Sequence, residues 1–314
     1  MMHTFRLSDA LRCILVNAPQ GSNLACPRDS LSGTRFLANP KLWQEILAQR
    51  RHRITLAWWE GNHLGGLASA RAGAGFRVWE LDYLYLPINS QDSQVNGRHD
   101  PLETVTLELL EQLVQAAGQR CAERIFLRVP ADSPVTRLAQ RAGFFPSFEE
   151  ILWEGQGSLS GSRGSPVSHC RDRLPQDDYP LFQLFSAATP GPVRTALGLT
   201  LDQWKEAREL RHQGCREMVT ENSGRITGWL SLLARWRVTE GEIVVHPDHS
   251  DLLSGLLDLA LARVGVHRWL VPDYQERVGE WLQSRGFRQA ARYVILVKTV
   301  TARVLSPGMA PVEA

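Results

Sequence analysis

Two carboxylates, Glu80 and Asp82, stand two residues apart in residues 77–86, which read RVWELDYLYL. The apolar and aromatic residues around them predict a β-strand, whose period of two places both carboxylates on one face, together with Leu84 and Leu86. A buried carboxylate is costly without a partner, so such a pair is typical of a site that handles protons. We expect Glu80 to act as a general base, directly or through a water molecule.

The same pair of carboxylates has a structural explanation as well. Both could face solvent or form ion pairs with arginines such as Arg77 and Arg128. The second half of the chain carries Glu240 and Glu242 in the polar stretch RVTEGE, where we expect the solvated start of a strand rather than a site.

His246 and His249 lie three residues apart in the sequence HPDH. Two imidazoles can bind a metal, but protein zinc sites use three or four ligands, and no third ligand stands at a suitable spacing. We therefore expect a surface turn before a helix at this place, and no metal centre.

The strand with Glu80 belongs to an order of elements that occurs twice. Two apolar stretches around a turn at 60–62 predict a hairpin, and the second half has the same pattern around 222–224. In each half a strand, a loop and an amphipathic helix follow, and Gly118 and Gly265 are the expected helix ends. Strands separated by helices predict mixed sheets covered by helices, one in each half.

The two halves also end alike, with a strand ending in Val-Pro, a short helix, a Gly-Phe pair and a last apolar strand. The shared spacing indicates an internal repeat. Between the halves, residues 155–168 are rich in Gly, Ser and Pro, which is typical of a flexible connector. The predicted units are an N-terminal domain (1–155), a linker (156–168), a C-terminal domain (169–302) and a tail (303–314).

The composition narrows the choice of partner and compartment. The formal net charge is +2 and the basic residues are scattered, which gives no sign of a nucleic-acid-binding surface. Five widely spaced cysteines without a CxxC pair predict reduced thiols. No segment approaches the roughly 20 apolar residues of a membrane span, and no signal peptide is recognisable. We expect a cytoplasmic protein that binds neither nucleic acid nor membranes.

With this order of elements the chain resembles the GNAT superfamily of acyl-CoA-dependent N-acyltransferases, in a tandem arrangement of two GNAT-like domains. The resemblance rests on WELDYLYL and RLAQRAGF in the first half and on VVHPDHSDLLSGLLDLALARVG and WLQSRGF in the second. It implies an α/β fold of the α+β type, in which each domain has a central mixed, mostly antiparallel sheet flanked by helices. It also implies acetyl-CoA, or another acyl-CoA, as cosubstrate and no metal.

The resemblance implies that the backbone of the central strand pairs with the pantetheine arm and that the following turn holds the pyrophosphate. A helix N-terminus offers unpaired N–H groups, and glycine lets a phosphate come close. The family's turn has Arg or Gln, two residues, Gly, one residue, then Gly or Ala, and residues 94–99 come nearest to it. The implied cofactor-binding residues are Leu84, Leu86, Gln94, Gly97, Arg98 and His99. In the second half, residues 250–255 keep only the last glycine, and Asp251 would repel a phosphate.

Acyl transfer from a thioester to an amine requires proton removal from an ammonium group, and often a proton for the departing thiolate. Glu80 is the expected base, and Asp82 the expected amine-binding residue or second base. The family commonly has a tyrosine acid five residues before the Phe of Gly-Phe, where this chain has Ala139 and Leu282. The tyrosines considered as substitutes are Tyr83, Tyr85 and Tyr274, although aromatic residues on strands more often belong to the core.

We therefore expect an acyl-CoA-dependent N-acyltransferase that transfers acetyl groups to a primary amine of a small molecule or protein, with its active site in the N-terminal half. A homodimer is a further option for a protein partner. The alternative is a catalytically inactive GNAT-like protein that binds CoA or another ligand, or that serves as a protein-interaction module. The degenerate second loop and the two missing tyrosines favour this alternative, because a shared fold does not fix activity.

Overall fold

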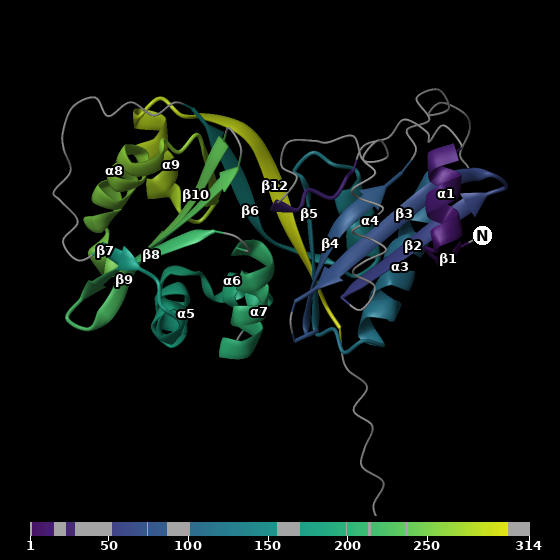
Figure 1. The fold of residues 1–314 in the computed structure, drawn as a ribbon, viewed down its shortest axis with the longest axis horizontal. Helices are drawn as coiled ribbons and strands as arrows, with labels where there is room; N and C mark the ends of the chain where they lie inside the picture. The colour runs from purple at the N-terminus through teal and green to yellow at the C-terminus, as the bar shows by residue number, and fades with distance from the viewer. Residues whose placement is uncertain are drawn as a thin grey trace, which may run out of the picture.

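The computed structural model describes residues 2–15, 23–28, 52–73, 75–86, 101–155, 170–198, 200–212, 215–235 and 238–300. These residues form one twelve-stranded sheet with helices on both faces (Figure 1). The strand order is β1-β2-β3-β4-β5-β12-β6-β11-β10-β9-β8-β7. The predicted linker (156–168) and tail (303–314) lie outside the described residues.

The first half of the described chain supplies strands β1 to β6 and three of the helices. The strands are β1 (Met2–Thr4), β2 (Arg53–Glu60), β3 (His63–Ala72), β4 (Val78–Tyr85), β5 (Arg124–Pro130) and β6 (Phe145–Glu154). The helices are α1 (Leu7–Leu15), α3 (Pro101–Gly118) and α4 (Val135–Arg141).

The second half repeats this order, and three helices of the described chain lie between its first two strands. The strands are β7 (Cys170–Asp172), β8 (Arg216–Asn222), β9 (Arg225–Arg235), β10 (Val238–Val245), β11 (Arg268–Pro272) and β12 (Arg288–Thr299). The helices are α5 (Asp178–Ala188), α6 (Gly191–Leu197), α7 (Leu201–His212), α8 (Leu252–Val264) and α9 (Glu276–Ser284), with 3-10 turns at Pro175–Asp177 and Pro247–His249.

The halves exchange their last strands. The C-terminal strand β12 pairs with β5 of the first half, and β6 pairs with β11 of the second half. The two exchanged strands also pair with each other in the middle of the sheet (Figure 1). The sequence left open whether the halves pack face to face or share a sheet, and the structure shows one continuous sheet.

Helices cover both faces of each half. In the first half, α3 and α4 cover the largest cluster of buried apolar residues, and α1 packs on the opposite face. In the second half, α8 and α9 cover one face, and α5 and α7 cover the other. The predicted layers, mixed sheet with flanking helices, are therefore confirmed, and both predicted hairpins form, with turns between β2 and β3 and between β8 and β9.

The two Gly-Phe pairs end α4 and α9 in the same way. Gly143 and Gly286 have φ angles of +81° and +85°, which favour glycine and turn the chain out of the helix. The next residues, Phe144 and Phe287, are buried in the clusters beneath these helices. The repeat in the sequence thus marks two equivalent helix ends, each sealed by an aromatic side chain.

The predicted faces of β4 are wrong in part because of a β-bulge. Leu81 pairs with Ala70 and Tyr83 with Ser69, which leaves Asp82 as an extra residue. A bulge shifts the alternation of side chains by one position. As a result Leu84 and Leu86 lie with Leu81 in the cluster under α3, rather than on the face of Glu80, and Tyr83 and Tyr85 lie on the opposite face.

None of the helices within the described residues is both long and apolar enough to cross a membrane.

Candidate functional site

Each half contains two parallel strands that separate after a short pairing. In the first half, β4 pairs with β5 only over residues 78–81 and 124–127. In the second half, β10 pairs with β11 only at Glu240–Arg268 and Gly241–Trp269, although β10 continues to Val245. Beyond these points the strand edges face each other across a slot. The sequence resemblance implies that the backbone of the central strand, here β4 or β10, pairs with a pantetheine arm, which stays a prediction.

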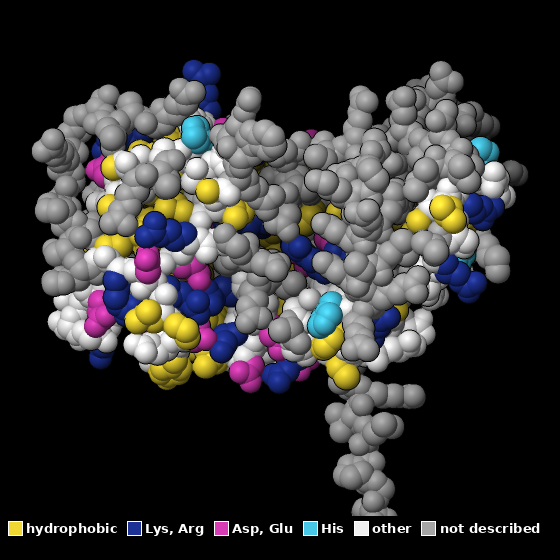
Figure 2. Space-filling view, in the orientation of Figure 1, with side chains coloured by type: hydrophobic (Ala, Val, Ile, Leu, Met, Phe, Trp, Pro, Cys, Tyr) yellow, Lys and Arg dark blue, Asp and Glu magenta, His cyan; other side chains and the backbone are white. Residues whose placement is uncertain are grey.

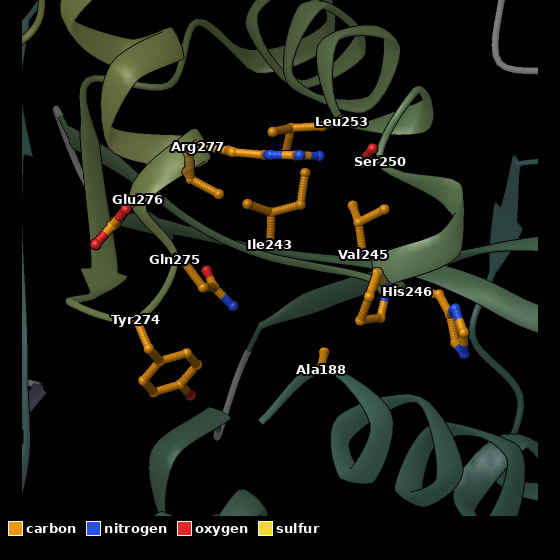
Figure 3. A pocket seen from close by; sticks show the side chains of 12 residues that line it. Ala188, Ile243, Val245, His246, Ser250, Leu253, Tyr274, Gln275, Glu276 and Arg277 are labelled. Carbon is orange, nitrogen blue, oxygen red and sulfur yellow. The ribbon is translucent and has the colours of Figure 1, made fainter. Parts of the chain in front are cut away.

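A cavity of about 390 Å³ lies at the end of β10 in the second half. This volume lies within the range of small-molecule sites, about 300–1,000 Å³. The end of β10, the starts of α8 and α9 and the last residue of α5 meet around it (Figure 3). The lining residues are Ala188, Ile243, Val245, His246, Pro247, Ser250, Leu253, Tyr274, Gln275, Glu276, Arg277 and Val278.

One side of the cavity is apolar. Ile243 and Val245 alternate along β10 and point to the same face, since the pairing of β10 with β9 is regular throughout. Leu253 from α8 and Val278 from α9 extend this surface. The arrangement suits a flexible, largely apolar arm laid along the strand.

Polar groups surround the apolar side. Figure 3 shows the Arg277 side chain reaching past Leu253 toward Ser250, with Tyr274 and Gln275 on the other side of Ile243. Arg277 is exposed and forms no ion pair with any other described residue. It is therefore a cation at the cavity with capacity for an anionic ligand.

The His246 ring is oriented by a hydrogen bond within its own turn. Its Nδ1 accepts a hydrogen bond from the Asp248 amide at 3.2 Å. A neutral imidazole that accepts at Nδ1 carries its proton on Nε2, which can then donate to a ligand. The predicted turn before a helix is confirmed, because a 3-10 turn spans Pro247–His249.

The start of α8 lies at the same cavity. The first amide groups of a helix have no carbonyl partner from a preceding helical turn and can bind an anion; at α8 the Leu253 amide already donates to Ser250 O at 3.3 Å. Ser250 and Leu253 line the cavity, whereas Asp251 is exposed and is not among the lining residues. Asp251 is the N-cap residue of α8, and its expected repulsion of a phosphate stays a prediction.

The slot of the first half is filled by the chain itself. The backbone N–H and C=O of Leu84, expected to pair with a pantetheine arm, instead bond to Asn23 and Leu24. The side chains of Leu84 and Leu86 are buried in the core, with exposures of 0% and 4%. The remaining predicted cofactor residues, Gln94, Gly97, Arg98 and His99, lie outside the described residues, and their role stays a prediction.

Glu80 and Asp82 each form an ion pair with an arginine. Glu80 Oε2 lies 2.7 Å from Arg71 Nη2, and Asp82 Oδ2 lies 2.6 Å from Arg53 Nη1. Burial raises the pKa of Asp82, and the nearby Arg53 opposes that shift. Both carboxylates are therefore ion-paired, as the structural alternative expected, but with Arg71 and Arg53 instead of Arg77 and Arg128. Neither carboxylate lines the cavity.

The expectation of a solvated strand start at Glu240 and Glu242 is wrong. Glu240 is only 6% exposed and lies 3.9 Å from Arg268. Glu242 forms an ion pair with Arg28 of the first half, and its side chain is 12% exposed. The polar neighbours in the sequence gave no sign of this burial, because strands and arginines distant in the chain cause it.

The three tyrosines considered as proton donors have different surroundings. Tyr85 is fully buried, and burial raises its pKa to about 12, whereas Tyr83 lies under the Arg53 guanidinium. Only Tyr274 of the three lines the cavity. Ala139 and Leu282, which occupy the family's tyrosine positions, are both buried in the core.

Charges of both signs are mixed over α5, α7 and β8. Arg173 and Lys205 contact Asp178, and Arg208 contacts Glu217. Figure 2 shows basic and acidic side chains intermingled on this face of the second half. No group of three or more His, Cys, Asp or Glu that could hold a metal ion occurs within the described part of the chain.

Sequence comparison and structure comparison give different results. No protein-family model matches the sequence, and no curated protein matches it. Among solved structures, a candidate acetyltransferase from Pyrococcus horikoshii aligns over 96% of this chain and 90% of its own, with a TM-score of 0.55 and 12% identity. A GCN5-related N-acetyltransferase from Sphaerobacter thermophilus aligns over 95% of both chains, with a TM-score of 0.53 and 14% identity.

A third structure is similar over the whole of this chain. A conserved Enterococcus faecalis V583 protein of unknown function, a candidate N-acyltransferase, aligns over 96% of this chain and 72% of its own, with a TM-score of 0.54 and 9% identity. At these identities the likeness concerns the fold. This chain therefore has the GNAT fold of acetyltransferases, built twice in tandem.

Proposed function

We propose that the protein is an acyl-CoA-dependent N-acyltransferase whose acyl-CoA binds in the C-terminal half. The observation that carries this proposal is the cavity lined by the end of β10, the loop that follows β11 and the starts of α8 and α9. It differs from the sequence-based expectation, which favoured the N-terminal half.

The cavity offers places for the pantetheine arm, the pyrophosphate and the thioester of the cosubstrate. The β10 edge beyond Gly241 has backbone groups for the amides of the pantetheine arm, and Ile243 and Val245 provide apolar contact. The start of α8 and the Arg277 guanidinium suit the pyrophosphate, since both attract anions. The thioester would then lie toward Tyr274, on the other side of Ile243 from Arg277 (Figure 3).

Tyr274 is the residue of this cavity best suited to protonate the departing thiolate. A phenol can donate a proton, and a thiolate is a tolerable leaving group, so one donor near the sulfur is sufficient. Glu276 is the one carboxylate among the lining residues, and Figure 3 shows it pointing away from Ile243. We therefore assign proton removal from the acceptor amine to water or to the amine's own equilibrium with solvent.

This lack of an inward carboxylate among the lining residues favours one second candidate, a protein that binds acyl-CoA without transferring the acyl group. Both candidates bind acyl-CoA, and only the transferase passes the acyl group to an amine.

A transfer assay separates them. Free thiol released from acetyl-CoA is measured with a panel of primary amines, including polyamines, amino acids and lysine peptides. Amine-dependent release supports the transferase, and we expect Tyr274→Phe to lower kcat about 10-fold to 100-fold with the Kd for acetyl-CoA unchanged. The exposed Tyr179, changed to Phe, is the matched control. Binding of acetyl-CoA without amine-dependent release from any amine favours the second candidate.

A further inference from the structure

The chain segment at residues 23–26 lies in the slot between β4 and β5. Leu24 N–H donates to Leu84 O at 2.9 Å, and Cys26 N–H donates to Arg128 O at 2.8 Å. The first of these bonds is to β4 and the second to β5. The segment therefore bridges the two strand edges where they no longer bond to each other.

The Asn23 side chain satisfies further groups of β4. Its Nδ2 donates to Asp82 O at 2.8 Å, and its Oδ1 accepts from Leu84 N–H at 2.8 Å. The same Oδ1 accepts from Ala25 N–H at 3.1 Å, which fixes the bend of the segment. The Asn23 side-chain amide thus pairs with the edge of β4 through one donor and one acceptor, as a backbone peptide group would.

The segment is packed as part of the core. Ala25 is 1% exposed and belongs to the cluster beneath α3, and Leu24 packs against that cluster. Cys26 packs against Leu152, Leu270 and Tyr293, where the exchanged strands meet. A ligand arm in this slot would have to displace these contacts as well as the hydrogen bonds.

The slot of the second half has no such occupant among the described residues. The one isolated bridge recorded for the described chain joins Asn23 to Tyr85, and it has no counterpart on β10. The corresponding part of β10 instead borders the cavity with Ile243 and Val245. The two halves thus share the strand geometry and differ in what lies in the slot.

The segment also contacts the second half of the chain. Arg28, whose side chain is 3% exposed, forms its ion pair with Glu242 on β10. A segment that is bonded to β4 and β5 and charge-paired with β10 is held by both halves. Its release would break contacts in each of them.

We propose that residues 23–28 permanently fill the N-terminal slot, so that the first half binds no acyl-CoA and the chain takes up one equivalent. The stoichiometry rests on the proposed function, whereas the filled slot does not. The segment takes the place that an extended ligand with amide groups would take, and it leaves the second slot as the ligand site.

Hydrogen exchange of the free chain tests the filled slot without any ligand. We expect amides in a peptide covering residues 23–28 to exchange at least about 100-fold more slowly than unstructured rates, and we expect the same of the β4 amides. Asn23→Ala should speed exchange in this peptide and at Leu84, whereas Asn62→Ala, at an exposed turn, should not. Exchange of residues 23–28 at unstructured rates in the wild type would overturn the proposal, whether or not the variant folds.

Equilibrium dialysis with acetyl-CoA tests the stoichiometry. One bound equivalent together with a protected segment supports the proposal, and two equivalents overturn it. A protected segment with no bound acetyl-CoA supports the filled slot and rejects the proposed function instead. The two ideas can therefore fail separately.

Discussion

Arg28 and Glu242 form an ion pair that joins the two halves of the chain, with side-chain exposures of 3% and 12%. Removing one charge from such a buried pair leaves the other without its partner, which typically costs about 3–5 kcal/mol. We expect Arg28→Ala to lower the free energy of unfolding by about 3 kcal/mol, measured by urea denaturation. The double variant Arg28→Met with Glu242→Leu should regain much of this loss.

An exposed ion pair provides the control for that prediction. Arg216 and Asp172 lie 3.0 Å apart with side-chain exposures of 61% and 65%. Surface pairs of this kind contribute about 0–1 kcal/mol, so Arg216→Ala should change stability little. Equal losses from Arg28→Ala and Arg216→Ala would show that the halves are not joined through a buried charge pair.

Arg277 should contribute to ligand affinity through its charge. A hydrogen bond to a charged group is worth about 1.5–3 kcal/mol, so we expect Arg277→Gln to raise the Kd for acetyl-CoA by about 10-fold or more. The salt dependence of the Kd should weaken in the same variant, because one phosphate-binding cation is gone. Arg225→Gln, at the exposed β8–β9 turn, is the control. An unchanged affinity in Arg277→Gln would place the phosphates elsewhere.

Cys13 and Cys121 should react differently with iodoacetamide. Burial raises the pKa of the Cys13 thiol from 9.0 to about 12, with Asp9 adding to the shift, whereas Cys121 is exposed. The thiolate is the reactive form, so at about pH 8 Cys121 should be alkylated and Cys13 should remain free, as measured by peptide mass spectrometry. Because the folded pKa is raised, the stability that Cys13 contributes is complete below its ordinary pKa and is lost as the pH rises toward 12. Alkylation of Cys13 as fast as Cys121 in the folded protein would contradict this account.

Asp177 should stabilise the second half in a pH-dependent way. Two hydrogen bonds from Arg171, at 2.7 and 2.9 Å, and one from the Leu174 amide hold the pKa of Asp177 below its ordinary value. A depressed folded pKa means that the stabilisation is present above the ordinary Asp pKa and is lost as the pH falls. The difference in unfolding free energy between wild type and Asp177→Asn should therefore shrink from about pH 6 toward about pH 3. Asp132→Asn, in an exposed turn, should show no comparable trend; a constant difference for Asp177→Asn would contradict the assignment.

The parts of the fold that depend on local sequence were predictable. Turn residues between apolar stretches gave both hairpins, and the Gly-Phe pairs gave the equivalent ends of α4 and α9. These features follow from backbone preferences of a few neighbouring residues. The family resemblance, which rests on their order, agrees with the fold found.

The parts of the fold that depend on residues distant in the sequence were not predictable. The bulge at Asp82 moved Leu84 and Leu86 to the other face of β4 from the one predicted, and it arises from pairing with β3. The exchange of β6 and β12 depends on pairing with β11 and β5, each of which belongs to the other half of the chain. The burial of Glu240 and Glu242 depends on Arg268 and Arg28, which stand far from them in the sequence.

The sequence predicted the kind of ligand for the site, an acyl-CoA, but it did not predict which half of the chain has the cavity. Motif matching favoured the first half, because residues 94–99 come nearer to the family turn than residues 250–255 do. It could not show that Asn23 and Leu24 bond to the strand edge of the first half. Tyr274 was among the tyrosines considered as proton donors, whereas the cation Arg277 was missed, because the family's turn does not include the start of α9.

The central claim, that acyl-CoA binds in the C-terminal cavity, is tested most directly by calorimetric titration of acetyl-CoA into three forms of the chain. These are the wild type, Val245→Trp, which fills the cavity, and Val238→Trp, a control at the other end of β10. We predict saturable binding in the wild type and in Val238→Trp, and no measurable heat of binding in a folded Val245→Trp. Binding of equal affinity in all three forms would contradict the claim, because the ligand would then lie outside this cavity.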